Sequence, residues 1–460
     1  MINSVVSYFY PDLNGAELRK FKLLAGTLFL TVGAYWLLRL LKDTLFFKVC
    51  FPMELGWLPC QGRLLQPVAK FWSPIVVLGL VLVYSKLVDL VKRHVLFYII
   101  CAVYAVLFGT FALTLFLRET YGNIYLGKTA LSMLGWVSYF AIESFGSLII
   151  ALFWSFTNSI TTSDAARRGY PMIIAGAQLG AIGGSSLMFL AHKMGLWQLF
   201  ALVTAFTLSI IPMMYYFVKT TPHTQMASDM PEHAHKKEAG FLEGIRLLAT
   251  KPYLMGILLV TTLFEVINQI LEYQMKSQAD TFPYFEGELG FAQFQGIYGV
   301  STNVLSFLMA LLGTSYLIKR FGLRFGLLFF PVCLIAGLAG LLTYYLFGTP
   351  SAGFLLFAIF LVMIMSKGLG YAVNNPVKEM MYIPTSKDAK FKTKGFIDVF
   401  GGRMAKLGGA QINDLFKHDL GELLVYGTLF SFGLSAVWIL AAIYVGNKNA
   451  QLVRDGEIVE

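Results

Sequence analysis

Ionisable side chains interrupt several of the long apolar runs in this 460-residue chain. Arg39, Lys42 and Asp43 lie within LLRLLKDTLFF, and Glu143 lies within FAIESFGSL. A charged side chain at the centre of a membrane helix costs about 2.5 to 3.5 kcal/mol on insertion scales, so such residues pair, meet water or hold an ion. The pattern indicates a polar, charge-lined site inside a membrane.

The C-terminal half carries a second set of ionisable residues inside apolar runs. They are Glu265, Glu272, Lys276, Lys367, Asp398, Arg403 and Lys406. Arg39 and Asp43 are spaced i,i+4, as are Glu272 and Lys276, so each pair shares a helix face. One interpretation is a set of interhelical salt bridges with a purely structural role. The cations outnumber the acids that could neutralise them, however, and Arg with Lys at a membrane midplane is what a polyanionic, phosphorylated substrate requires.

Motifs for other chemistry are weak or absent. The segment GNIYLGKT, residues 122–129, matches the phosphate-loop pattern letter for letter, but RETY at the end of an apolar run precedes it instead of a buried strand. The sequence contains no H-E-x-x-H or G-x-S-x-G motif and no metal-ligand spacing among its six His. We therefore expect no enzymatic activity, no cofactor, no metal and no nucleic-acid partner. Cys50 and Cys60 share a loop, and whether they pair depends on the compartment that the loop faces.

The elements that position these residues are expected to be membrane helices. The chain is 57% hydrophobic and only 13% charged, which excludes an ordinary soluble protein. Twelve apolar runs are long enough to span a bilayer. They lie at about 23–47, 67–86, 95–117, 137–158, 169–191, 197–218, 253–275, 293–318, 325–347, 352–374, 395–416 and 424–446.

The runs fall into two groups of six on either side of a polar linker. We predict an all-α membrane protein with an N-terminal six-helix bundle (1–218), a cytoplasmic linker (219–251) and a C-terminal six-helix bundle (252–460). Most Lys and Arg residues fall on the side that holds both termini, which predicts cytoplasmic termini. The basic turns YSKLVDLVKRHVLF and YLIKRFGLRFGLLF follow the second and eighth runs and resemble the major facilitator architecture. Gly176, Gly180 and Gly184 form a small-residue stripe that we interpret as helix packing.

Several segments together resemble the ATP:ADP antiporter type of nucleotide transporter of plastids and obligate intracellular bacteria. They are LLRLLKDTL (37–45), YSKLVDLVKRHVLFY (84–98), ESFGS (143–147), FWSFTNSIT (153–161), EYQMKSQ (272–278), MSKGLGYAVNNPVKEMMYIPTSKDAKFKTKGFIDV (365–399) and RMAKLGG (403–409). The segment containing P-x-K-E-M-x-Y-I-P is the most specific. By motif, Lys42, Glu143, Glu272 and Lys406 match the family's functional residues. Phe145 replaces the family's usual Trp, and Gly370 stands where many members have a second Lys.

The resemblance implies a major-facilitator-like nucleotide transporter that exchanges ATP for ADP, with phosphate, by alternating access. Alternatives are a proton-coupled nucleotide symporter and a carrier of another phosphorylated organic anion. The expected phosphate-binding residues are Arg39, Lys42, Lys367, Arg403 and Lys406. The expected gating or coupling residues are Asp43, Glu143, Glu265, Glu272, Lys276 and Asp398, and the candidates for stacking on the base are Tyr35 and Trp36. The expected setting is the inner membrane of a bacterium, with nucleotide and lipid as partners of a monomer.

Overall fold

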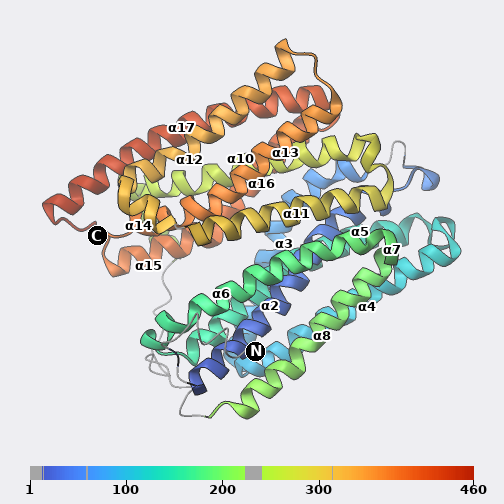
Figure 1. Ribbon diagram of the computed structural model, residues 1–460, viewed down its shortest axis with the longest axis horizontal. Coiled ribbons are helices and arrows are strands. Elements are labelled where there is room, and N and C mark those ends of the chain that lie inside the picture. The colour runs from blue at the N-terminus through green and yellow to red at the C-terminus, as the bar shows by residue number, and fades with distance from the viewer. Residues whose placement is uncertain (1–12, 14, 58–60, 223–240, 313, 460) are drawn as a thin grey trace. The chain divides into compact units, whose positions relative to one another are not determined.

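The protein is built from helices. The computed structural model describes residues 13, 15–57, 61–222, 241–312 and 314–459 (Figure 1). Within these residues the extended structure is limited to an isolated bridge between Thr385 and Val459. A helix satisfies its backbone N–H and C=O groups internally, which is the requirement that a bilayer imposes. The predicted all-α class is confirmed.

The chain divides into two compact units. Unit 1 comprises Met1–Gly62, Ile75–Ala234 and Phe285–Val300, and unit 2 comprises Arg63–Pro74, His235–Tyr284 and Ser301–Glu460. Two helices, α3 (Gly62–Leu90) and α11 (Gly287–Leu312), are therefore each divided between the units. The predicted bundle boundaries at 218 and 252 remain a prediction.

Unit 1 contains the longest N-terminal helices. They are α2 (Gly15–Thr44), α4 (Arg93–Tyr121), α5 (Asn123–Ser159), α6 (Ser163–Ser186), α7 (Ala191–Met194) and α8 (Leu196–Thr220), with short π and 3-10 segments at η1 (Leu45–Val49), η2 (Met53–Leu55) and η3 (Leu187–Leu190). The glycine stripe of α6 packs against α2, and the two helices lie side by side (Figure 1). A Cβ atom at Gly180 would overlap the carbonyl oxygen of Phe29, and one at Gly184 would overlap that of Gly33. The packing interpretation of the stripe is confirmed.

Unit 2 contains the remaining helices. They are α9 (Phe241–Thr250), α10 (Pro252–Thr281), α12 (Thr314–Phe347), α13 (Ala352–Leu369), α14 (Asn375–Met381), α15 (Lys387–Phe396), α16 (Gly402–Phe416) and α17 (Leu420–Asp455), with η5 (Pro283–Phe285), η6 (Gly370–Asn374) and η7 (Ile397–Gly401), of which η5 extends to Phe285 of unit 1. Side-chain caps begin helices α6, α13, α15 and α17. For example, the side chain of Asp419 accepts hydrogen bonds from the backbone N–H groups of Gly421 and Glu422.

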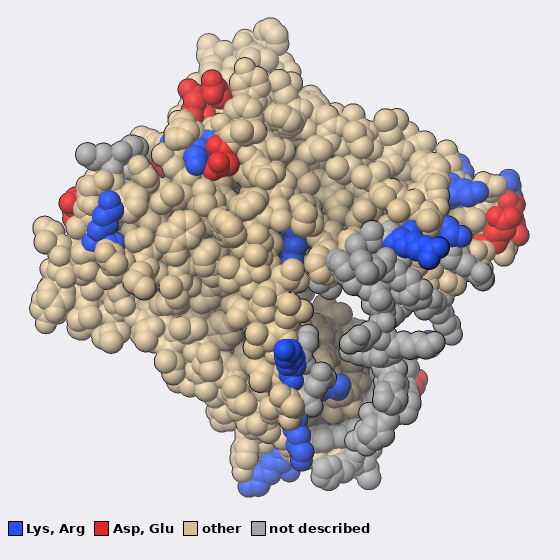
Figure 2. Space-filling model, turned by 180° about the vertical axis from the view of Figure 1, so that it is seen from behind, with Lys and Arg blue, Asp and Glu red and all other residues tan. Residues whose placement is uncertain are grey.

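Ten helices of the described chain are long and apolar enough to cross a membrane. The other two predicted spans, 293–318 and 395–416, fall on α11 and on the η7–α16 segment, which are not among these ten helices. The predicted span 293–318 also has wrong boundaries, because α11 ends at Leu312 and α12 begins at Thr314. Figure 2 shows that uncharged side chains dominate the described surface in that view, as expected for contact with lipid.

Candidate substrate site

Unit 1 holds a buried lysine between two acids. Lys42 is in the last turn of α2, only 1% exposed, and its Nζ forms a salt bridge with Oε1 of Glu143 on α5. Oδ1 of Asp43 lies 3.9 Å from the same Nζ, and the ring of Tyr139 lies 4.2 Å away on another side. The side chain of Glu143 is 22% exposed, so the acid of this pair is less enclosed than the lysine.

The base-stacking candidates of α2 lie just before this lysine. Trp36 is buried, and the guanidinium of Arg39 lies over its ring at 5.0 Å from the centroid. The half-buried Tyr35 packs against Gly146 of α5, where a Cβ atom would overlap the tyrosine ring. Both rings thus have protein contacts in this structure, and a role in stacking on a nucleobase remains a prediction.

Phe145, which departs from the glutamate motif that the sequence resembles, packs against α4. Phe145 is fully buried, and its ring centroid lies 5.1 Å from that of Tyr104 and 5.3 Å from that of Phe108. The hydroxyl groups of Tyr104 and Ser144 lie 2.7 Å apart and form a hydrogen bond in the same contact. Phe145 therefore helps to seat α5 on α4.

Unit 2 repeats the arrangement with one acid and two lysines. Glu272 of α10 is 5% exposed. Its Oε1 lies 2.6 Å from Nζ of Lys276, and its Oε2 lies 3.7 Å from Nζ of Lys367 on α13. Lys276 is fully enclosed, whereas the side chain of Lys367 is 15% exposed. The predicted i,i+4 contact of Glu272 with Lys276 is confirmed, and Lys367 is the cation that remains partly accessible.

A polar stripe runs along α10 through this cluster. Glu265, Asn268, Glu272 and Lys276 follow i,i+3,i+7,i+11 spacing and so share one helix face. Asn268 accepts a hydrogen bond of 2.8 Å from the hydroxyl of Ser366, the neighbour of Lys367. Glu265 is half-buried and has no hydrogen bond or ion pair within the described residues. Asn268 and Tyr139 are not among the site residues predicted from the sequence, although an amide inside an apolar run is itself a signal of a polar site.

The remaining cations lie on α16. Arg403 is half-buried, and its Nη1 atom is enclosed with no hydrogen-bond partner among the described residues. Lys406, one turn later, has an exposed side chain. Asp398 belongs to η7, and its side chain lies outside the described part of the structure. A buried guanidinium nitrogen that lacks an acceptor is suited to bind an anionic oxygen.

Three π-helical segments occur among the described residues, and each adjoins one of these clusters. Segment η1 (Leu45–Val49) follows Lys42 and Asp43, η6 (Gly370–Asn374) follows Lys367, and η7 (Ile397–Gly401) precedes Arg403. A π-helical turn re-aims the side chains around it and is frequent at functional sites. A π-helical segment therefore lies beside candidate cations in both units.

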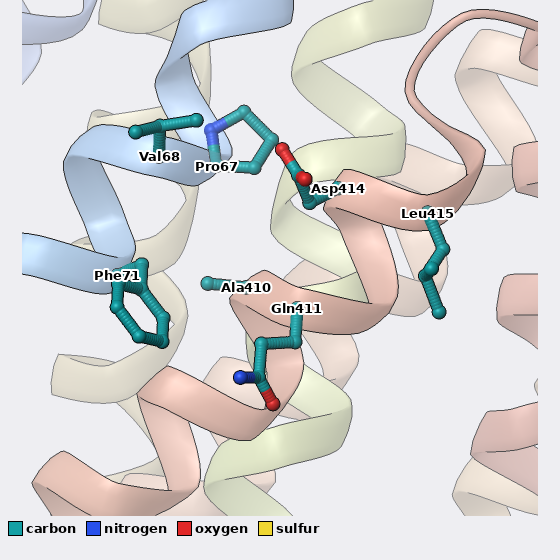
Figure 3. A pocket seen from close by; sticks show the side chains of 7 residues that line it. All are labelled: Pro67, Val68, Phe71, Ala410, Gln411, Asp414 and Leu415. Atoms are coloured by element: carbon teal, nitrogen blue, oxygen red, sulfur yellow. The ribbon is translucent and has the colours of Figure 1, made fainter.

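A cavity of about 510 Å³ in unit 2 does not contain the candidate cations (Figure 3). Pro67, Val68 and Phe71 of α3 line one wall, and residues of α16 that include Gln411 and Asp414 line the other. Leu415 at its edge is 70% exposed. Exposed apolar side chains of this kind on a membrane helix suit contact with lipid tails.

Comparison with known proteins identifies the family of this chain. The family model of the TLC ATP/ADP transporters matches residues 1–446. The chain belongs to the TLC ATP/ADP transporter family. The family resemblance inferred from the sequence is therefore confirmed, and the protein is a multi-pass membrane protein of a transporter family.

The relatives of this family member come from plants and intracellular bacteria. ADP,ATP carrier protein 2 of Arabidopsis thaliana chloroplasts is 25% identical over 85% of this chain and 70% of its own length. ADP,ATP carrier protein 1 of Chlamydia pneumoniae is 24% identical over 95% of this chain and 92% of its own length. The plant relatives are therefore longer, and the chlamydial carrier has nearly the same extent.

Two solved structures resemble the family member in fold alone. A bacterial homologue of the iron transporter ferroportin in an inward-facing state has a TM-score of 0.60 at 15% identity, over 92% of this chain and 99% of that one. The POT family transporter PepTSo also has a TM-score of 0.60, at 13% identity over 95% and 98%. The predicted major-facilitator-like fold is confirmed.

The GNIYLGKT segment starts at the turn between α4 and α5. A helix precedes it, whereas a phosphate loop follows a strand. This agrees with the prediction that the segment is not a phosphate loop.

Proposed function

We propose that this protein exchanges ATP for ADP, with phosphate, across a membrane by alternating access. Its membership of the TLC ATP/ADP transporter family and the ADP,ATP carrier names of its relatives support this assignment. The geometry adds chemistry that suits a polyphosphate, because each unit encloses lysines inside a membrane helix bundle and holds them with carboxylates.

The salt bridge between Lys42 and Glu143 is the observation that carries the proposal. An ammonium buried to 1% exposure needs a counter-ion, and Glu143 supplies one. A phosphate oxygen is a stronger and more highly charged acceptor, and it replaces Glu143 beside Lys42 when nucleotide binds. Arg39 lies one helical turn before Lys42 and provides a planar guanidinium for a second phosphate oxygen.

The same exchange of partners operates in unit 2. Lys367 leaves Glu272 for a phosphate group, while Lys276 stays on Glu272 and keeps the acid neutralised. Arg403 supplies an unsatisfied donor, and Lys406 supplies an exposed ammonium. Glu265 and Asp398 are the other acids of this unit to which the sequence assigns a gating or coupling role.

Strict exchange requires that the carrier reorients slowly when no nucleotide is bound, and the charged residues of the site make that reorientation costly. Lys42 is paired with Glu143 and Lys367 lies near Glu272, and separating these charges without a substrate anion to replace the acids is costly inside the membrane. We further propose that the membrane is the inner membrane of a bacterium, with both termini cytoplasmic and the monomer as the working form. The excess of Lys and Arg on the side of the termini supports this orientation.

Uptake of radiolabelled ATP into proteoliposomes, with and without internal ADP, tests the proposal. We expect uptake only when ADP is inside. Uptake that ignores internal nucleotide and stops when a proton gradient is collapsed would instead assign proton symport. Absence of ATP uptake by folded protein under every loading would overturn the nucleotide assignment and favour another phosphorylated anion.

A further inference from the structure

Helices α3 and α11 begin in matching ways. Each starts with a glycine followed by a charged residue, Gly62-Arg63 in α3 and Gly287-Glu288 in α11. Each is also divided between the two units after its first half, with Arg63–Pro74 in unit 2 and Phe285–Val300 in unit 1. The first half of α3 therefore belongs to unit 2 and its second half to unit 1, whereas the first half of α11 belongs to unit 1 and its second half to unit 2.

An ion pair fixes the first turn of α11. Oε2 of Glu288 lies 2.6 Å from Nη1 of Arg118 at the end of α4. Nε of the same arginine donates a 2.7 Å hydrogen bond to Oδ1 of Asn123, whose Nδ2 donates to Oε2 of Glu54 at 3.1 Å. These residues border a cavity of about 420 Å³ in unit 1. The ion pair is thus oriented by neighbours but stays within reach of water, with side chains 19% and 34% exposed.

An ion pair of opposite polarity fixes the first turn of α3. Nε of Arg63 lies 3.9 Å from Oδ2 of Asp280 at the end of α10, and its Nη1 donates a 2.9 Å hydrogen bond to the carbonyl of Lys417. The hydroxyl of Tyr273 donates to the carbonyl of Arg63 at 3.0 Å. A cation is disfavoured at a helix N-terminus, so Arg63 depends on these acceptors.

Beneath the Arg118–Glu288 pair, the first half of α11 is packed closely on unit 1. Phe291 stacks on Phe47 with centroids 5.1 Å apart and planes 18° apart. Deeper still, a Cβ atom at Gly299 would lie 2.7 Å from Leu40 and 2.9 Å from Oγ of Ser185. The first half of α11 is thus held by an ion pair, an aromatic stack and a close glycine contact. All three contacts are non-covalent, so they can open and re-form.

We propose that Arg118–Glu288 and Arg63–Asp280 are paired latches that must open each time the carrier exposes its site on the membrane face where α4 ends and α11 begins. The proposal rests on the alternating-access function proposed above. In that cycle the first halves of α3 and α11 separate from the units that hold them here. Arg118 and Glu288 act as positioning residues, since they hold a helix and do not touch the substrate.

Labelling of a cysteine at position 185 tests the latch. Ser185 is fully buried at the bottom of the α11 contact, so Ser185→Cys reports when α11 moves away. Cys50, Cys60 and Cys333 are replaced by Ser, and the fully buried Cys101 of α4 is retained as an internal control of folding. The protein is placed in lipid nanodiscs, and the rate of reaction with a water-soluble maleimide is measured by mass spectrometry.

We expect Glu288→Gln and Arg118→Gln each to raise the labelling rate at position 185 about three- to fivefold, the range of a partly exposed ion pair. The charge-swapped double variant Arg118→Glu with Glu288→Arg should return the rate part of the way to that of the parent, because the new pair forms but both charges oppose the helix dipoles. Glu119→Gln is the matched control, because Glu119 lines the same cavity and has no ion pair within the described chain. It should leave the rate unchanged.

Three results would overturn the latch. They are an unchanged rate in Glu288→Gln, no recovery in the charge-swapped variant, and an equal rise at Cys101, which would mean that the ion pair only keeps unit 1 folded. Labelling needs no substrate, so the result is independent of the ATP assignment. If Glu288→Gln is labelled faster but the parent protein exchanges no nucleotide, the latch is supported and the proposed function is rejected.

Discussion

The ammonium of Lys42 on α2 forms a salt bridge with the carboxylate of Glu143 on α5, 101 residues later in the chain. The lysine is almost fully buried and the glutamate is partly exposed. The pair therefore has a fixed cation and an acid that can be displaced. We propose that substrate phosphate displaces this acid, and this exchange of partners links the buried charge to transport.

Replacing Lys42 should abolish most transport. We expect Lys42→Ala to lower ATP uptake about 10- to 100-fold, the loss that corresponds to one charge-assisted hydrogen bond. Lys86→Ala removes the same charge from an exposed position on α3 and should leave uptake unchanged. Initial rates in proteoliposomes provide the measurement. Equal rates in the two variants would show that Lys42 does not bind substrate.

Neutralising Glu272 should destabilise unit 2. Glu272→Gln leaves the fully buried Lys276 without its carboxylate, and breaking a buried pair by removal of one partner costs about 3 to 5 kcal/mol. We expect a clearly lower melting temperature in detergent. The double variant with Lys276→Met removes the orphaned charge and should recover much of the loss. If the single variant melts like the parent, the pair has no structural role.

The close contact of α6 with α2 predicts strict selection for glycine at position 180. Gly180→Val forces two extra methyl groups and a Cβ against the backbone of Phe29, and overpacking of this kind costs about 1 to 3 kcal/mol. Gly79→Val on α3 is the matched control, since a Cβ there meets no atom within 4 Å. Size-exclusion profiles and thermal melts report the difference. Similar behaviour of the two variants would contradict the observed packing.

The orientation of the chain is testable with reporter fusions. Both termini are proposed to be cytoplasmic, so green fluorescent protein fused after Asp455 should fluoresce in a bacterial host. Alkaline phosphatase at the same position should be inactive, whereas a fusion in the turn at Gly122 should be active. Active phosphatase after Asp455 would reverse the proposed topology.

The apolar pattern predicted most of the fold, because a run of about 20 apolar residues has few alternatives to a membrane helix. The pattern was less informative at α11 and α16. Gln295, Thr302 and Asn303 are buried in α11, and Arg403 is half-buried in α16. These polar residues lower the hydropathy of both segments, so hydropathy alone predicts their helix ends less accurately.

Within the site, local spacing predicted the contact of Glu272 with Lys276, since both lie on one helix face. Spacing could not identify Glu143 as the partner of Lys42 or place Tyr139 against it, because these contacts join residues of different helices. The π-helical segments beside Lys42, Lys367 and Arg403 depend on tertiary packing in the same way.

Release of radiolabelled ADP from preloaded proteoliposomes after addition of external ATP tests most directly whether the protein is an exchanger that uses Lys42. We predict rapid ADP efflux that depends on external ATP and is lost in Lys42→Ala. No efflux from liposomes that contain folded parent protein, or equal efflux in Lys42→Ala, would contradict this mechanism.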